Sequence, residues 1–257
     1  MTQFADQVYL IGRRSVVRTV RQPANVIAPL VFPMLLLAVN SGGLKAETHL
    51  PGFPTSSFVA FALAVPFIQG ALFATMNTGT DLARDIQTGF LNRLTLTPMR
   101  GTALLCGQLG GVVALSLVQA TVYLGVGIIT GVRIASGPAG VLVIFAFAAL
   151  VGLAFGALGA FAALRTGSGE AVQSLFPAFF VFLFISSMNI PRNLIETTWF
   201  RDAATANPVS YLLEAVRSLI ITGWDGEALA LGFGIATVIA IVALAASSWA
   251  LRVRMAR

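Results

Sequence analysis

The chain has 257 residues, of which 57% are hydrophobic and only 10% are charged. Soluble domains carry about 25% charged residues, so this composition excludes a soluble globular domain and predicts an all-α polytopic membrane protein. The formal net charge of +6 says little about nucleic acid, because basic residues of membrane proteins gather on the cytoplasmic side.

Residues 1–23 form a polar leader in which four arginines alternate with apolar side chains. This pattern predicts a basic amphipathic helix on the inner membrane surface; the alternative is that the arginines only anchor the orientation of the first span. The leader is too long for a signal peptide, and the run after it lacks the small-residue site at which such a peptide is cleaved. The arginines are Arg13, Arg14, Arg18 and Arg21.

Six apolar runs are predicted to be membrane helices, because a bilayer core of about 30 Å requires about 20 helical residues. The first run contains Pro29 and Pro33, which are tolerated when neighbouring helices hydrogen-bond the carbonyl groups that the prolines leave free. The predicted spans are 24–40, 55–80, 102–131, 138–164, 171–188 and 227–250.

The basic residues orient these spans. With both termini in the cytoplasm, eleven of the sixteen basic residues lie inside and five lie outside, which satisfies the positive-inside rule. The sequence therefore predicts one multi-pass domain over residues 1–257 in the inner (cytoplasmic) membrane.

The segment 81–100, between the second and third predicted spans, is unusually rich in charge. It contains Arg84, Asp85 and Arg93 in a chain that has few charges elsewhere. A charged side chain costs at least about 2.5 kcal/mol at the centre of a bilayer. We therefore expect this segment to lie in water at the cytoplasmic surface, where it offers a docking surface.

The segment 189–226, before the last span, is too polar for a span and too apolar for a solvated loop. Asn207 is a good N-cap and Pro208 suits the first helical position. On the helix that follows, Tyr211, Glu214 and Arg217 share one face, and apolar residues occupy most of the other. This pattern predicts a helix that lies in or dips into the outer interface; the alternative is an external loop with one short helix.

The sequence contains no Walker A loop, zinc-protease motif or nucleophile elbow, and it predicts no catalytic residues. His49 is the only histidine and Cys106 the only cysteine, so we expect no metal site. Ionisable side chains are nearly absent from the spans, which places any energy source outside this chain.

The middles of the spans do contain a few amide side chains. They are candidates for lining a substrate route, although interhelical hydrogen bonding is the favoured interpretation for each. Small-residue pairs at spacing four, such as Gly107 and Gly111, favour close helix packing. The amide residues are Gln69, Asn77, Gln108, Gln119 and Gln173.

The runs RDIQTGFLNRLTLTPMRG and NPVSYLLEAVRSLIITG resemble two motifs of one family, the type-2 ATP-binding-cassette (ABC) exporter permeases, and especially its daunorubicin-resistance-like branch. The run RDIQTGFLNRLTLTPMRG resembles the family's cytosolic segment, with Phe90 and Asn92 departing from the common residues. The run NPVSYLLEAVRSLIITG is similar to the signature before the last span. The matching residues are Asp85, Gly89, Leu91, Arg93, Leu94, Thr97 and Pro98 in the first motif, and Asn207, Pro208, Tyr211, Glu214, Arg217 and Gly223 in the second.

The resemblance implies that the segment 81–100 is a coupling helix that docks into a separate ATPase subunit. The ATP and magnesium would be held by that partner, and this chain would need no cofactor. Arg84, Asp85 and Arg93 would then complement the charge of the partner, and Gly89 would break the helix. An apolar stripe for the same contact would come from Leu82, Ile86, Phe90 and Leu94, and Pro98 would end the motif.

The resemblance further implies two permease copies, as a homodimer or a heterodimer, around a central path. The second motif would be a re-entrant element at the extracellular gate. We expect export of a hydrophobic drug, lipid or glycolipid. Alternatives are export of polysaccharide, haem or a small cation, an ATP-independent carrier or channel, and a membrane-embedded enzyme.

Overall fold

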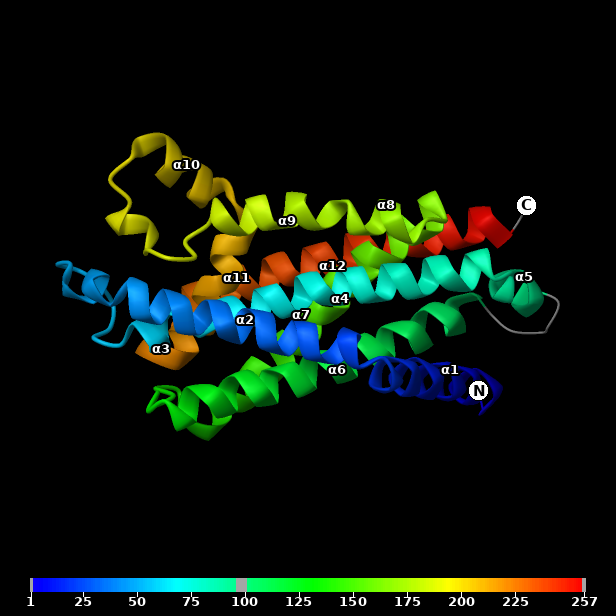
Figure 1. The fold of residues 1–257 in the computed structure, drawn as a ribbon, viewed down its shortest axis with the longest axis horizontal. Coiled ribbons are helices and arrows are strands. Elements are labelled where there is room, and N and C mark those ends of the chain that lie inside the picture. The colour runs from blue at the N-terminus through cyan, green and yellow to red at the C-terminus, as the bar shows by residue number, and fades with distance from the viewer. Residues whose placement is uncertain (1, 96–100, 256–257) are drawn as a thin grey trace.

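The computed structural model describes residues 2–95 and 101–255, and every regular element within these ranges is a helix. Figure 1 shows a bundle drawn out along one axis, with both chain ends and helix α5 at one end. We call this end the terminal end and the opposite one the distal end. The predicted all-α polytopic membrane architecture is confirmed.

Five helical segments are long and apolar enough to cross a membrane. Each coincides with a predicted span to within a few residues, except that α4 continues past residue 80. The segments are α2 (Pro23–Gly43), α3 and α4 together (Phe58–Ala62 and Ala64–Gln87), α6 (Gly101–Ile129), α7 (Gly137–Thr166) and α12 (Gly226–Met255).

The predicted span 171–188 corresponds to two short helices, α8 (Gly169–Gln173) and α9 (Leu175–Phe184). The Ser168 hydroxyl starts α8 by accepting a hydrogen bond from the Ala171 amide. Together these helices form an apolar segment that is shorter than the other five. A sixth crossing of the membrane therefore stays a prediction.

Helix α4 is the centre of the bundle, and nearly all of its apolar stretch is buried. It packs most extensively against α7, where the backbones meet at Gly159. A Cβ atom at Gly159 would lie only 2.1 Å from the carbonyl oxygen of Thr75, and the Thr75 hydroxyl donates to the carbonyl of Phe155 at 2.9 Å. This contact fixes α4 and α7 against each other.

The prolines of α2 are compensated as expected. Pro29 and Pro33 lack the amide protons that the carbonyls of Asn25 and Pro29 would accept in a regular helix. The Asn77 amide of α4 donates to the Asn25 carbonyl at 3.0 Å, and the Tyr123 hydroxyl of α6 donates to the Pro29 carbonyl at 2.6 Å. Neighbouring helices thus satisfy both freed carbonyls.

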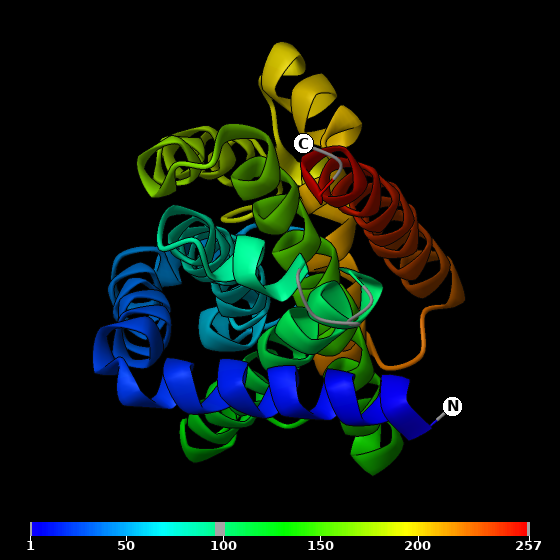
Figure 2. The same ribbon diagram turned by 90° about the vertical axis from the view of Figure 1, so that its right-hand side faces the viewer.

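The leader forms helix α1 (Thr2–Arg21), which lies across the terminal end of the bundle (Figure 2). It packs on α6 at two glycines. A Cβ atom at Gly107 would lie 2.6 Å from the Cβ of Ile11, and one at Gly111 would lie 2.3 Å from the Ser15 hydroxyl. The small-residue pair therefore lets α1 approach the α6 backbone.

The distal end is built mainly from the segment before α12. It contains η2 (Arg192–Leu194), α10 (Thr198–Ala206), α11 (Pro208–Arg217) and a π-helical turn η3 (Ser218–Thr222), while η1 (Lys45–His49) follows α2. Helix α11 packs on α4 and α12, and Leu212, Leu213 and Val216 are fully buried. The predicted helix is present, but its apolar face meets the core of the bundle rather than a membrane surface.

Candidate functional site

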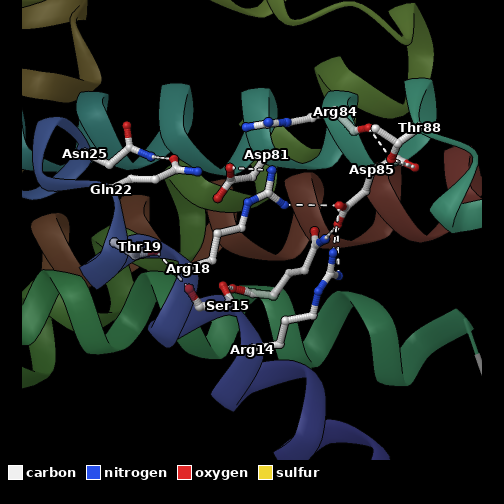
Figure 3. A network of polar contacts seen from close by, with 11 residues as sticks. Arg14, Ser15, Arg18, Thr19, Gln22, Asn25, Asp81, Arg84, Asp85 and Thr88 are labelled. Atoms are coloured by element: carbon white, nitrogen blue, oxygen red, sulfur yellow. Dashed lines mark hydrogen bonds and ion pairs between the residues drawn. The ribbon is translucent and has the colours of Figure 1, made fainter.

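The first candidate site is an ionic cluster where α1 meets the end of α4 (Figure 3). The guanidinium of Arg14 donates to both carboxylate oxygens of Asp85, at 3.0 and 3.2 Å. Arg18 bridges the two acidic residues of α4, contacting Asp85 at 3.1 Å and Asp81 at 3.0 Å. The cluster contains two positive and two negative side chains and joins the leader to α4.

The Asp85 carboxylate is the centre of this cluster. It is only 4% exposed, and the Gln108 amide of α6 also donates to it at 3.4 Å. A carboxylate that leaves water is stabilised only when several charge-assisted hydrogen bonds replace its hydration. Asp85 therefore depends on α1 and α6 together, and it ties three helices at one point.

Arg14 also contacts the segment after α4. Its guanidinium lies 3.8 Å from the ring centroid of Phe90, which is within the range of a cation–π interaction. Phe90 is one of the two positions at which this chain departs from the family motif. Helix α1 thus touches the segment predicted to dock the ATPase.

The turn between α4 and α5 (Phe90–Thr95) occurs where it was predicted. Gly89 has a φ of +69°, a conformation that residues other than glycine adopt at a cost, and its amide donates to the Ile86 carbonyl at 3.0 Å. The Arg93 side chain is exposed and donates to the Thr88 carbonyl at 3.1 Å. The segment therefore leaves α4 and exposes a basic side chain at the terminal end.

The other residues predicted for ATPase coupling have different positions. Arg84 is exposed and Ile86 is half-buried. Asp85, expected to face a partner, is buried by its arginines, and Leu82 of the proposed apolar stripe is fully buried in the core. Leu94 belongs to α5 but its side chain is not among those described, and Pro98 lies outside the described residues.

The second candidate site lies at the distal end and begins at Asn207. Its side-chain oxygen accepts a hydrogen bond from the Val209 amide, and its nitrogen donates to the carbonyls of Phe182 and Ile185. Pro208 occupies the first position of α11. The predicted N-cap is confirmed, and the same side chain also joins α11 to the end of α9.

Glu214 of α11 forms an ion pair with Arg192, with hydrogen bonds of 2.6 and 2.7 Å. The Arg192 guanidinium lies 4.3 Å from the ring centroid of Tyr211. Burial by itself would lower the pKa of Arg192, but the hydrogen bonds and charges of Glu214 and Tyr211 together outweigh it and raise that pKa. Two predicted residues, Tyr211 and Glu214, therefore hold an arginine that the sequence interpretation left out.

Arg217 differs from Arg192 because no carboxylate among the described residues binds it directly. It is only 6% exposed, and it donates to the carbonyls of Phe61, Ser187 and Met188. Its guanidinium also lies 3.6 Å from the ring centroid of Phe61. The side chain thus joins α11 to the start of the second span and to the loop after α9.

The chain turns away from α11 at the π-helical turn η3 and at Gly223. A π-turn leaves carbonyl groups free of the usual helical bonds. The amides of Ala135 and Ser136, in the α6–α7 connection, donate to the carbonyls of Ile220 and Leu219 at 3.0 and 3.1 Å. Gly223 has a φ of +99°, which explains why glycine stands there.

The amide residues proposed for a substrate route do not form one surface. Gln69 and Gln119 are buried between α4 and α6, each with one polar atom that has no hydrogen-bond partner within the described part of the chain. Asn77 binds the Asn25 carbonyl, Gln108 binds Asp85, and Gln173 is exposed. For Asn77 and Gln108 the structure shows the interhelical hydrogen bonds that were the favoured interpretation.

Sequence reasoning missed the partners in both sites. Arg14 and Arg18 are four residues apart, as are Asp81 and Asp85, so each pair shares a helix face. The matching spacing of these two oppositely charged pairs is the sequence pattern from which the terminal-end cluster could have been predicted. For Arg192 the sequence shows only a basic residue near the start of the distal segment.

The fold and these sites define a multi-pass helical membrane protein with a charged turn at one end and a buried arginine, Arg217, at the other. The chain belongs to the ABC-2 type transporter family, whose model matches residues 6–221.

Relatives agree with this assignment. The chain is 30% identical to the daunorubicin resistance ABC transporter permease protein DrrB1 of Streptomyces coeruleorubidus over 201 residues, 76% of this chain and 66% of that protein, just under two thirds of its length. It is 24% identical to the putative transport permease ycf38 of Porphyra purpurea over 227 residues, 87% of this chain and 77% of that protein. Against ycf38 of Cyanophora paradoxa the identity is 22% over 221 residues, covering 84% and 74%.

Proposed function

We propose that this chain is the transmembrane permease subunit of an ATP-driven exporter, with ATP hydrolysed by a separate ATP-binding-cassette subunit. Its membership of the ABC-2 family is the observation that carries this proposal. The coupling surface would be the turn at Gly89 and helix α5, where Arg93 is exposed. Magnesium and ATP would belong to the partner.

The ionic cluster gives this coupling surface a mechanical connection. A force on α5 reaches Phe90, and Phe90 contacts Arg14 of α1. Arg14 and Arg18 are held by the end of α4, and α1 continues through Gln22 into the first span α2. A movement of the ATPase would therefore shift α1, α2 and α4 together and change the balance between inward- and outward-open states.

The orientation we propose places the terminal end in the cytoplasm. Eleven of the sixteen basic residues belong to the segments and tails that this orientation places inside, in agreement with the positive-inside rule. The whole chain would act as one permease domain in a cell membrane, paired with a second permease copy. The distal end, with Asn207, Glu214 and Arg217, would form the outer gate.

We propose a hydrophobic compound, such as a drug, a lipid or a glycolipid, as the cargo. The name of DrrB1, a daunorubicin resistance permease, supports the drug. Large apolar side chains are exposed along α2, α9 and α12, among them Leu35, Phe182 and Val238. Such surfaces suit contact with lipid and lipid-soluble molecules.

Site-directed cross-linking tests the coupling surface. Cys106 is replaced by serine, and single cysteines are placed at exposed Arg93 of α5 and, as a matched control, at exposed Arg133 of the distal end. We expect the cysteine at 93, and not that at 133, to cross-link to the ATP-binding-cassette subunit that co-purifies with the chain. Cross-linking at 133 alone, or no co-purifying ATPase, would contradict the proposal.

A further inference from the structure

The distal end contains a cavity of about 560 Å³, within the size range of small-molecule sites. Three arginines and two carboxylates line it: Arg192, Arg201, Arg217, Glu214 and Asp225. Positive charge is therefore in excess, at an end of the protein where few basic residues are found.

The two carboxylates are already engaged. Glu214 forms the ion pair with Arg192. The Asp225 carboxylate accepts hydrogen bonds from the amides of Glu227 and Ala228 at 3.1 Å, at the start of α12, where the helix dipole favours a negative charge. Neither carboxylate makes a hydrogen bond or ion pair with Arg201 or Arg217 among the residues the structure describes.

The two remaining arginines differ in whether their guanidinium groups already have hydrogen-bond acceptors. Arg217 is buried, and its donors are directed to backbone carbonyls that carry no full negative charge. Arg201, on α10, is exposed, and its guanidinium has no partner within residues 2–95 and 101–255. A guanidinium offers five donors in a planar fork that matches a phosphate or carboxylate. Arg201 is therefore available to a ligand that enters the cavity.

The rest of the lining is mixed. Pro54 and Ile221 supply apolar surface. The hydroxyls of Thr205 and Thr222 add polar surface, although each already donates to a carbonyl of its own helical turn. A ligand that fits this environment has an anionic head and an apolar tail.

We propose that the distal-end cavity binds an anionic amphiphile, with Arg201 as the anchor for its phosphate or carboxylate group and Pro54 and Ile221 in contact with its apolar part. A role of this cavity in holding or releasing cargo rests on the proposed export function. The binding of the amphiphile to the cavity does not depend on that function. The positive potential of Arg217 draws the anion inward, and the Arg192–Glu214 pair forms one wall.

Calorimetric titration of the chain alone, in nanodiscs of zwitterionic lipid, tests this site with hexyl phosphate as the probe. We expect saturable binding that Arg201→Gln weakens about tenfold or more, the loss of one charge-assisted pair. Arg133→Gln, which removes an exposed distal-end arginine outside the cavity, should leave the affinity unchanged. Comparing variants in the same nanodiscs removes the contribution of partitioning into lipid.

Three related probes sharpen the result. Hexyltrimethylammonium and hexanol should not show saturable binding, and equal binding of either would overturn the anion site. Inorganic phosphate should bind more weakly than hexyl phosphate; equal affinity would overturn the apolar subsite. Unchanged binding in Arg201→Gln would also overturn the assignment. Because no ATPase is present, failure here leaves the cross-linking test of the export function unaffected.

Discussion

Arg14 of α1 and Asp85 of α4 form a two-pronged ion pair although 71 residues separate them in the chain. The pair joins a helix that lies across the terminal end to the last turns of the central helix. Asp85→Ala would remove the acceptor shared by two arginines and Gln108. We expect a loss of about 3 kcal/mol in unfolding free energy, as for other broken buried pairs.

The charge-swapped protein Arg14→Asp/Asp85→Arg provides the control for that experiment. Each single change should lower the apparent unfolding temperature and the substrate-stimulated ATPase rate of the assembled transporter. The double change should recover part of both, since it restores one opposite-charge pair. Single variants that both behave like the unchanged protein would show that the pair does not connect α1 to α4 in the working protein.

The packing of α1 on α6 predicts different results for two adjacent glycines. Gly111→Val places a side chain where a Cβ atom alone lies 2.3 Å from the Ser15 hydroxyl, whereas a Cβ atom at Gly110 meets no atom within 4 Å in the part of the chain that the structure describes. We expect Gly111→Val to displace α1 and Gly110→Val to leave it in place. Spin-label distances between α1 and α6 in nanodiscs measure the displacement; equal distances in both variants would refute this packing.

The Tyr123 hydroxyl predicts a rescue by a change in a different helix. Tyr123→Phe leaves the Pro29 carbonyl without a donor, at a cost of about 1 kcal/mol for one hydrogen bond within a membrane protein. Pro33→Ala supplies the missing amide proton within α2, so the cost of Tyr123→Phe should largely vanish in that background. A double-mutant cycle of unfolding free energies in mixed micelles measures the coupling. Additive costs would contradict the hydrogen-bond explanation.

Gly89 predicts graded effects at the turn before α5. A Cβ atom at this position meets no atom of the described residues within 4 Å, so the cost of a substitution comes from its left-handed backbone conformation. Gly89→Asn should be mild, because asparagine tolerates this conformation, while Gly89→Val should cost about 1–2 kcal/mol. We expect transport coupled to ATP hydrolysis to fall in the same order, with membrane insertion intact. Equal coupling in both variants would remove Gly89 from the coupling surface.

The distal end predicts separate roles for two charged residues of α11. Glu214→Gln removes the charge that holds Arg192, and we expect impaired export with normal assembly. Arg217→Met leaves three buried carbonyls without their donor, at a cost of about 1–3 kcal/mol each, so this variant should assemble poorly. Size-exclusion profiles and export by reconstituted vesicles distinguish the two. Normal export by Glu214→Gln would exclude its role in the gate.

Local features of this fold could be predicted from the sequence because their causes are local. Asn207 followed by Pro208 indicates a helix start, Gly89 indicates a break in a helix, and five apolar runs indicate helices that cross a membrane. Each signal depends on one or a few neighbouring residues and on known backbone preferences.

The missed features depend on partners far away in the chain. The family resemblance implies that Asp85 faces the partner, yet Arg14 and Arg18 stabilise it in a buried position. The acceptors of Arg217 are main-chain carbonyls, which every residue possesses and which therefore leave no trace in the sequence. Only the three-dimensional packing of α3, α9 and α11 identifies them.

The hydrogen bond from Arg217 to the Phe61 carbonyl spans 156 residues, and this span has a consequence for biogenesis. The Arg14–Asp85 pair can close once the second span has been inserted, but the distal end must wait until nearly the whole chain has left the ribosome. Until then the start of the second span lacks its guanidinium partner. Any chain truncated before residue 217 therefore leaves the Phe61 carbonyl without this donor, and the distal end stays unlocked until synthesis has passed that residue.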